Sequence, residues 1–186
     1  MTEMTRAREL DPLSLIINTN LGRIFYFQRR YDAAIEQYER TLRIEPEFGG
    51  ALWKLWHAQE RAGRTEKAFA ALESWAKSTG AEDLVEVLRR AYRERGYTGA
   101  LRGLLDRFPA SGRVDPYNLA LIYAKLGEKS AAFKWLDQAC REHSGEIVYL
   151  DVEPIFDAIR SDARFTGIRT CVGLTAASPA TRAASR

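Results

Sequence analysis

Apolar residues recur along most of the chain at the three- and four-residue spacing that places side chains on one face of a helix. Residues 13–48 show the pattern twice, with a polar turn at Arg29, Arg30 and Tyr31 between the two stripes. Pro46 then ends the second stripe, because proline cannot continue a helix. The pattern predicts two antiparallel helices. The apolar positions of the two stripes are Leu15, Leu21, Phe25, Ala34, Ile35, Tyr38 and Leu42.

The same helix pair returns further along the chain. Ala68 follows Ala34 by 34 residues, and this shift predicts a second pair over residues 49–80. A later pair over residues 113–146 places Ala132 at the same position. Ala132 follows Ala68 by 64 residues, where two full periods would need 68, so residues 81–112 form a shortened, degenerate unit. We expect its helices over residues 82–95 and 98–108, followed by the longest loop at Pro109, Ser111 and Gly112.

The two ends of the chain depart from the repeated pattern. Residues 1–12 match only the second helix of a preceding unit, so we expect the chain to be a piece of a longer protein or to begin inside an array. Residues 147–174 predict short capping helices, with Pro154 in a first turn and Ser161 or Asp162 as a helix cap. Residues 175–186, rich in Ala, Ser and Thr, predict a disordered tail.

A sequence motif in the first unit indicates which type of helical repeat this is. The first unit reads Asn18-x-x-Leu21-Gly22-x-x-Phe25, then Ala34-x-x-x-Tyr38, then Pro46. With Asn in place of tryptophan, this resembles the tetratricopeptide repeat, and the resemblance extends over about residues 2–142. It implies an all-α fold, a right-handed superhelix of stacked helix pairs with a C-terminal capping segment, and a protein-binding scaffold without catalytic activity.

A narrower resemblance involves two further stretches. Asp11-Pro12-Leu13-Ser14 and Asp157-x-x-Arg160-Ser161-Asp162-x-Arg164-Phe165 look like the C-terminal repeat region of certain bacterial multidomain proteins. Those proteins carry an N-terminal winged-helix, adenylate cyclase or protein kinase domain. The resemblance implies a regulatory module of a signalling or transcription-regulatory protein, but no such effector domain lies in this sequence.

Composition narrows the function classes. Lys and Arg number 28 and Asp and Glu 25, so the net charge of +3 gives no general attraction to nucleic acid. Cys140 and Cys171 lie outside any metal or redox spacing, which favours a reducing compartment or no selection on thiols, with the cytoplasm as the default location. The polar first eight residues predict neither a signal peptide nor a membrane span.

The resemblance implies that the first helix of each pair lines a concave groove. A peptide with apolar anchors and one or two carboxylates would suit the aromatic and basic residues there. Arg23 and Arg61 are the strongest candidates, whereas the aromatic side chains could instead pack between repeats. The predicted ligand positions are Arg23, Tyr26, Phe27, Trp53, His57, Arg61, Arg90, Tyr117 and Lys125.

The sequence shows no catalytic constellation, and we expect no catalytic residue, cofactor or metal. Cys140 and His143 are close in sequence, but a zinc site needs further ligands, so a solvated helix end is the better interpretation. We expect a protein or peptide partner, no membrane, and a homodimer through the uncapped N-terminal helix as a further interaction. The alternatives are an uncharacterised helical enzyme and a nucleic-acid-binding repeat using the arginines of residues 89–107, whose charge neighbouring acidic residues offset.

Overall fold

The computed structural model describes residues 2–108 and 114–174, and the chain divides into two compact units, Met1–Gly112 and Arg113–Arg186. Within the described residues all regular structure is helical, which confirms the predicted all-α class. No helix there is long and apolar enough to cross a membrane. The predicted loop at Pro109, Ser111 and Gly112 and the predicted tail at residues 175–186 lie outside the described residues.

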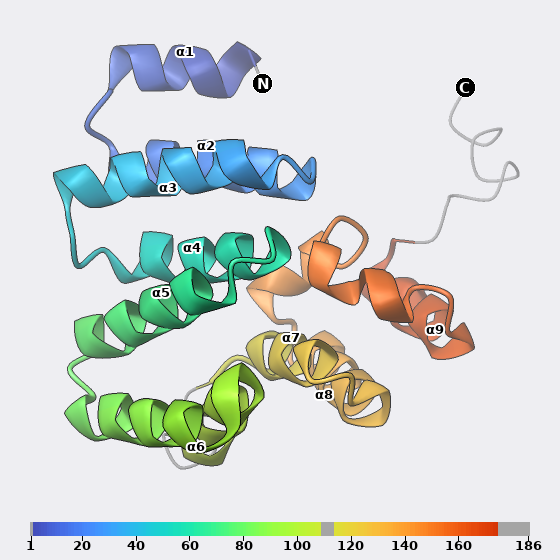
Figure 1. Cartoon of the computed structure of the whole chain (residues 1–186). Coiled ribbons are helices and arrows are strands. Elements are labelled where there is room, and N and C mark those ends of the chain that lie inside the picture. Colours follow the sequence, from blue (N-terminus) through green and yellow to red (C-terminus); the bar gives the residue numbers. More distant parts are fainter. Residues whose placement is uncertain (1, 109–113, 175–186) are drawn as a thin grey trace, which may run out of the picture. The chain divides into compact units, whose positions relative to one another are not determined.

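Unit 1 is built from antiparallel helix pairs (Figure 1). α2 packs on α3 and α4 on α5, while α3 also packs on α4, so that each pair covers the apolar face of the next. The helices of unit 1 are α1 (Thr2–Leu10), α2 (Leu15–Phe27), α3 (Tyr31–Ile44), α4 (Gly49–Arg61), α5 (Thr65–Ser78) and α6 (Glu82–Arg107).

Small residues set the close approach inside the first pair. Ala34 on α3 has no exposed surface, and a Cβ added to Gly22 on α2 would lie 2.4 Å from the Tyr38 ring. Ala68 on α5 is likewise fully buried at the position equivalent to Ala34. The alanine that repeats in the sequence is therefore a fully buried position on the second helix of each pair.

Asn18 fills the position that the repeat motif assigns to tryptophan. Its side-chain amide donates to the backbone carbonyls of Pro12 and Ser14, both at 2.9 Å. Its carbonyl oxygen accepts from Gln37 at 2.9 Å. Because Asn18 and Gln37 are both buried, these bonds satisfy polar groups that water cannot reach, and they join the turn before α2 to α3.

The degenerate third unit forms a helical run with a break. α6 is interrupted at Arg95 and Gly96, and Gly96 has φ +64°, where a side chain would be strained. The second half of α6 then folds back closely on the first, because Gly99 leaves room only for a hydrogen: a Cβ there would lie 2.4 Å from the Ala91 carbonyl oxygen. The break at Arg95 and Gly96 coincides with the end of the helix predicted over residues 82–95 and precedes the helix predicted over residues 98–108.

Unit 2 contains one helix pair and the segments that cap it. Asp115 caps the first helix by accepting from the Tyr117 amide at 2.8 Å, and it also accepts from the Ser144 hydroxyl. Ala132 is fully buried, as Ala34 and Ala68 are. The elements are α7 (Pro116–Lys125), α8 (Lys129–Arg141), the 3₁₀ helices η2 (Gly145–Tyr149) and η3 (Pro154–Ile159), and α9 (Ala163–Val172).

The capping segment buries four large apolar residues in the core of unit 2, while Val148 and Val152 stay exposed. Phe156 and Ile159 from η3 and Phe165 and Ile168 from α9 are all at most 7% exposed. Asp162 caps α9 by accepting from the Arg164 amide at 3.0 Å, and hydrogen bonds from Arg164 lower the pKa of this carboxyl to about 2. The sequence predicts two short helices in this segment, one with Pro154 in its first turn and one capped by Ser161 or Asp162. η3 and α9 lie at these positions, and η2 precedes them.

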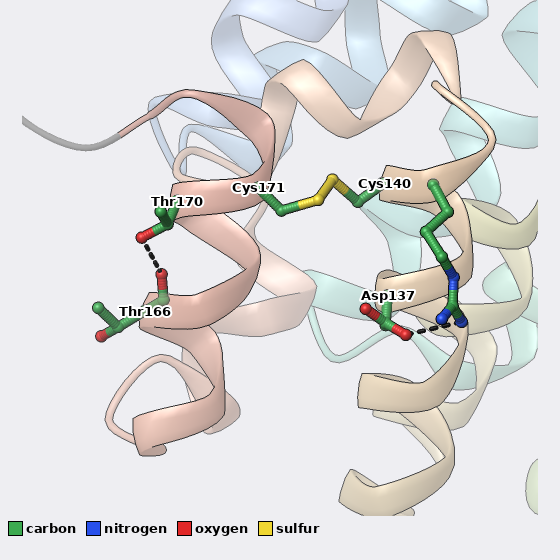
Figure 2. Close-up of a disulfide and its surroundings, with 6 residues drawn as sticks. Asp137, Cys140, Thr166, Thr170 and Cys171 are labelled. Carbon is green, nitrogen blue, oxygen red and sulfur yellow. Dashed lines mark hydrogen bonds and ion pairs between the residues drawn. A yellow bond between two sulfur atoms is a disulfide. The ribbon is translucent and has the colours of Figure 1, made fainter.

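A disulfide between Cys140 and Cys171 links α8 to α9, with 6.3 Å between the Cα atoms (Figure 2). The interpretation of Cys140 and His143 as a solvated helix end is therefore wrong for Cys140, which is 5% exposed and bonded to sulfur. Sequence spacing missed the pair because the two cysteines are 31 residues apart and meet only when α9 packs on α8.

Candidate functional site

The predicted ligand positions of unit 1 lie on α2, α4 and α6, and those on α4 belong to a cluster of aromatic rings. The ring of half-buried Trp53 is central to it, with centroid distances of 4.9 Å to Trp56, 5.0 Å to His57 and 4.7 Å to Trp75. Trp56 has no exposed surface and His57 is 5% exposed. Most of this face of α4 is therefore packed.

The second half of α6 covers this face of α4. At its start, Tyr97 accepts a hydrogen bond from the Trp56 indole and donates one to the Glu60 carboxylate. At its end, the Phe108 ring lies 6.4 Å from the Trp53 ring. Since Tyr97 meets the end of α4 and Phe108 meets its beginning, the two segments run antiparallel. The second half of α6 therefore contacts the side of α4 on which Trp53, Trp56 and Glu60 lie.

Burial determines the protonation state of Tyr97. Desolvation raises the pKa of its hydroxyl far above the ordinary value, and the negative charge of Glu60 raises it further. The hydroxyl stays protonated at any physiological pH and can always donate to Glu60. Trp56, Tyr97 and Glu60 thus form a fixed hydrogen-bonded chain between α4 and α6.

The face of α2 that carries the first predicted ligand positions keeps more open surface. Ile16 is 60% exposed, and Arg23 and Phe27, which follow it at helical spacing, are half-buried. Tyr26 differs, because it is 4% exposed and packs against Phe27 and Tyr31 at centroid distances of 5.7 and 5.9 Å. We therefore define the open α2 face as Ile16, Arg23 and Phe27.

Two predicted arginines of unit 1 are exposed: Arg61 at the end of α4 and Arg90 on α6. The basic cluster around Arg90 is partly neutralised, since Arg89 pairs with Glu73 at 2.6 Å and with Glu86 at 3.1 Å. Arg107 pairs with Asp83.

The remaining predicted positions belong to unit 2. Tyr117 is 2% exposed, and its ring meets Phe156 edge-on at 5.5 Å. Burial raises the pKa of its hydroxyl well above the ordinary value, and within the described residues that hydroxyl makes no hydrogen bond. Tyr117 is therefore a core side chain of unit 2. Lys125, at the end of α7, is half-buried.

Family models of the tetratricopeptide repeat match residues 19–83 and residues 117–142. The chain contains tetratricopeptide repeats. The first match extends from α2 to the beginning of α6, and the second includes most of α7 and α8. No curated protein matches the chain significantly.

Tetratricopeptide repeats generally mediate protein–protein interactions, and proteins of this family are typically non-catalytic scaffolds. The described residues contain no group of three or more His, Cys, Asp or Glu side chains that could hold a metal ion. The narrower resemblance to bacterial multidomain regulators has no support in these matches.

The sequence contains one indication of the contact between α6 and α4, which is the spacing of two aromatic residues. Tyr97 and Phe108 are eleven residues apart, which is three turns of a helix, so they lie on one face. The stretch that carries them falls outside both matched tetratricopeptide ranges. The surface that Tyr97 and Phe108 contact depends on how the chain turns at Gly96. The helical period does not predict the direction of that turn.

We expect Tyr97→Phe to destabilise unit 1 by about 1–3 kcal/mol, because it leaves the buried Trp56 indole without its acceptor. Urea unfolding followed by tryptophan fluorescence measures the change. Tyr92→Phe is the matched control, since Tyr92 stacks on Phe69 at 3.9 Å and its hydroxyl makes no hydrogen bond within the described residues. Equal stability of the two variants would contradict the role assigned to the Tyr97 hydroxyl.

Proposed function

We propose that this chain is a non-catalytic interaction module that binds a protein segment on the open α2 face, with Arg61 as a second contact. The main support for this proposal is that Ile16, an exposed apolar side chain, lies on the same helix face as Arg23 and Phe27. Such a face suits a peptide that presents an apolar anchor and a carboxylate, which a guanidinium can bind through two hydrogen bonds. The tetratricopeptide matches support a protein partner.

The packing of unit 1 makes this proposal narrower than the groove expected from the sequence. Trp53 and His57 pack in the aromatic cluster, and the second half of α6 covers their side of α4. A ligand that leaves this packing intact would therefore bind along α2. Arg90 remains exposed on α6, and Lys125 belongs to unit 2.

A peptide library displayed on phage tests the proposal. We expect selected peptides to share an apolar residue and an acidic residue, and the combined Arg23→Glu and Arg61→Glu variant to bind them at least about tenfold more weakly, because it reverses two contact charges. The combined Arg40→Glu and Arg93→Glu variant carries the same charge change at exposed positions outside the open α2 face.

Thermal unfolding must show that both double variants fold like the parent chain. Undiminished binding by the Arg23 and Arg61 variant would remove the open α2 face from the proposal. Equal loss in both double variants would mean that net charge, and not this face, holds the peptide.

The wider setting is also a proposal. We infer a cytoplasmic regulatory module of a larger bacterial signalling or transcription-regulatory protein, on the resemblance of Asp11-Pro12-Leu13-Ser14 and the stretch from Asp157 to Phe165. The Cys140–Cys171 disulfide puts a condition on the location, since such bonds are rare in reducing compartments and are often transient there.

A homodimer through the N-terminal helix is the remaining partner proposal. Leu10, Leu13 and Ile16 are close in sequence and are 81%, 69% and 60% exposed. Exposed apolar side chains of this kind support an interaction between chains. Nucleic-acid binding is less well supported, because the pairing of Arg89 and Arg107 with acidic side chains lowers the positive field of α6.

A further inference from the structure

A hollow of about 420 Å³ opens at the turn edge of unit 1. It is formed by the turn between α2 and α3, the first residues of α3, and the turn between α4 and α5. Its lining includes none of the three residues that define the open α2 face, although Arg29 donates to the backbone carbonyl of Phe27 at 2.6 Å. We call it the arginine hollow. Its lining residues are Arg29, Arg30, Tyr31, Asp32, Ala33, Ala62 and Arg64.

Positive charge dominates the arginine hollow, because its lining has three arginines and one aspartate. Arg64 donates to Asp32 at 2.7 Å, and the Arg30 guanidinium lies 4.8 Å from the centre of the Phe25 ring. A guanidinium has five N–H donors, so these contacts leave Arg30 and Arg64 with donors for a ligand. The surplus of two positive charges matches a dianion.

Arg29 adds an observation from the backbone. It has φ +60°, whereas the equivalent turn positions of the other two matched repeats are glycines, Gly63 and Gly127, both at φ +75°. A left-handed conformation costs a non-glycine residue about 1 kcal/mol. The first repeat bears this cost and gains a guanidinium in the lining of the arginine hollow.

We propose that the arginine hollow binds a phosphate group in its dianionic form. The phosphate oxygens accept hydrogen bonds from Arg30 and Arg64, with Arg29 adding positive charge. Asp32 competes with the phosphate for Arg64, because its carboxylate already accepts from that guanidinium. This site is separate from the peptide face of the proposed function and does not depend on it.

Calorimetric titration at constant ionic strength tests the site with two probes, inorganic phosphate and a short phosphoserine peptide without other charged side chains. We expect saturable binding that weakens about fivefold or more in Arg64→Gln and in Arg29→Gly. Asp32→Asn should tighten it several-fold, because it removes the competing carboxylate. Arg43→Gln, at an exposed position of α3 outside the arginine hollow, should leave it unchanged.

Arg29→Gly separates binding from folding. It restores the residue found at the equivalent turns, so the melting temperature should stay the same or rise while phosphate affinity falls. Absence of saturation by both probes up to about 20 mM, a concentration that detects even millimolar affinity, would overturn the proposal. Equal affinity in the parent chain, Arg64→Gln and Arg29→Gly would also overturn it.

The two probes identify the source of the phosphate. Binding of the phosphoserine peptide about tenfold more tightly than inorganic phosphate, equivalent to roughly 1.4 kcal/mol, would assign the arginine hollow to a phosphorylated protein segment. Equal affinities would assign it to a small phosphate compound. Either result, together with the loss in Arg64→Gln, supports the phosphate site.

Discussion

Ala34→Asp will destabilise unit 1 by several kcal/mol, about 3 or more, and Ala132→Asp will do the same to unit 2. Both alanines are fully buried, and each lies on the second helix of a pair whose two helices pack together. A larger side chain separates the helices, and its carboxylate is buried without a partner. A loss of this size is a large fraction of the stability of an ordinary domain.

Urea unfolding monitored by far-ultraviolet circular dichroism measures both changes. Ala70→Asp is the control, because Ala70 is an exposed residue of α5 and tests the lower helix propensity of aspartate alone. If Ala34→Asp and Ala132→Asp unfold at the same urea concentration as the parent chain, the register assigned to the repeats is wrong.

Reduction of the Cys140–Cys171 disulfide will cost unit 2 about 3–4 kcal/mol, since the bond closes a loop of 31 residues that becomes unrestricted in the reduced, unfolded chain. Cys171 is exposed and so open to attack by a reductant, whereas Cys140 is buried. α9 keeps other contacts, including the ion pair between Arg169 and Asp151 at 2.8 Å. The reduced unit 2 should therefore stay folded but melt at a lower temperature.

Thermal unfolding with and without a phosphine reductant measures this loss. Cys171→Ser provides the control, because it should match the reduced parent chain and should not respond to the reductant. Equal melting of the oxidised and reduced parent chain would show that the bond contributes nothing to stability. In that case the stability of unit 2 would not depend on whether the protein is in a reducing or an oxidising compartment.

The open α2 face and the arginine hollow divide recognition between two surfaces of unit 1. The first offers an exposed apolar side chain on the same helix face as Arg23, and the second offers guanidinium groups around Asp32. Arg61 and Arg64 are neighbours in sequence, but we assign Arg61 to peptide binding and Arg64 to phosphate binding. The combined Arg23→Glu and Arg61→Glu variant and the Arg64→Gln variant therefore distinguish the two proposals experimentally.

The sequence by itself determined the helix pairs, because their signals are local. Spacing of apolar residues marks the helices, glycine or proline marks their ends, and Ala34, Ala68 and Ala132 mark the close contacts. The break in α6 was also foreseeable, since Gly96 lies between the two stretches predicted as helices. Each of these features depends on neighbouring residues in the chain or on one repeat period.

Only the tertiary structure decided which surfaces stay open. The helical period placed Trp53, His57 and Tyr117 at ligand positions, yet packing surrounds Trp53 with other rings and buries His57 and Tyr117. The cover over α4, the Cys140–Cys171 bond and the arginine hollow all join residues distant in sequence. Periodicity gives the face of a helix on which a residue lies, but burial depends on what the rest of the chain places against that face.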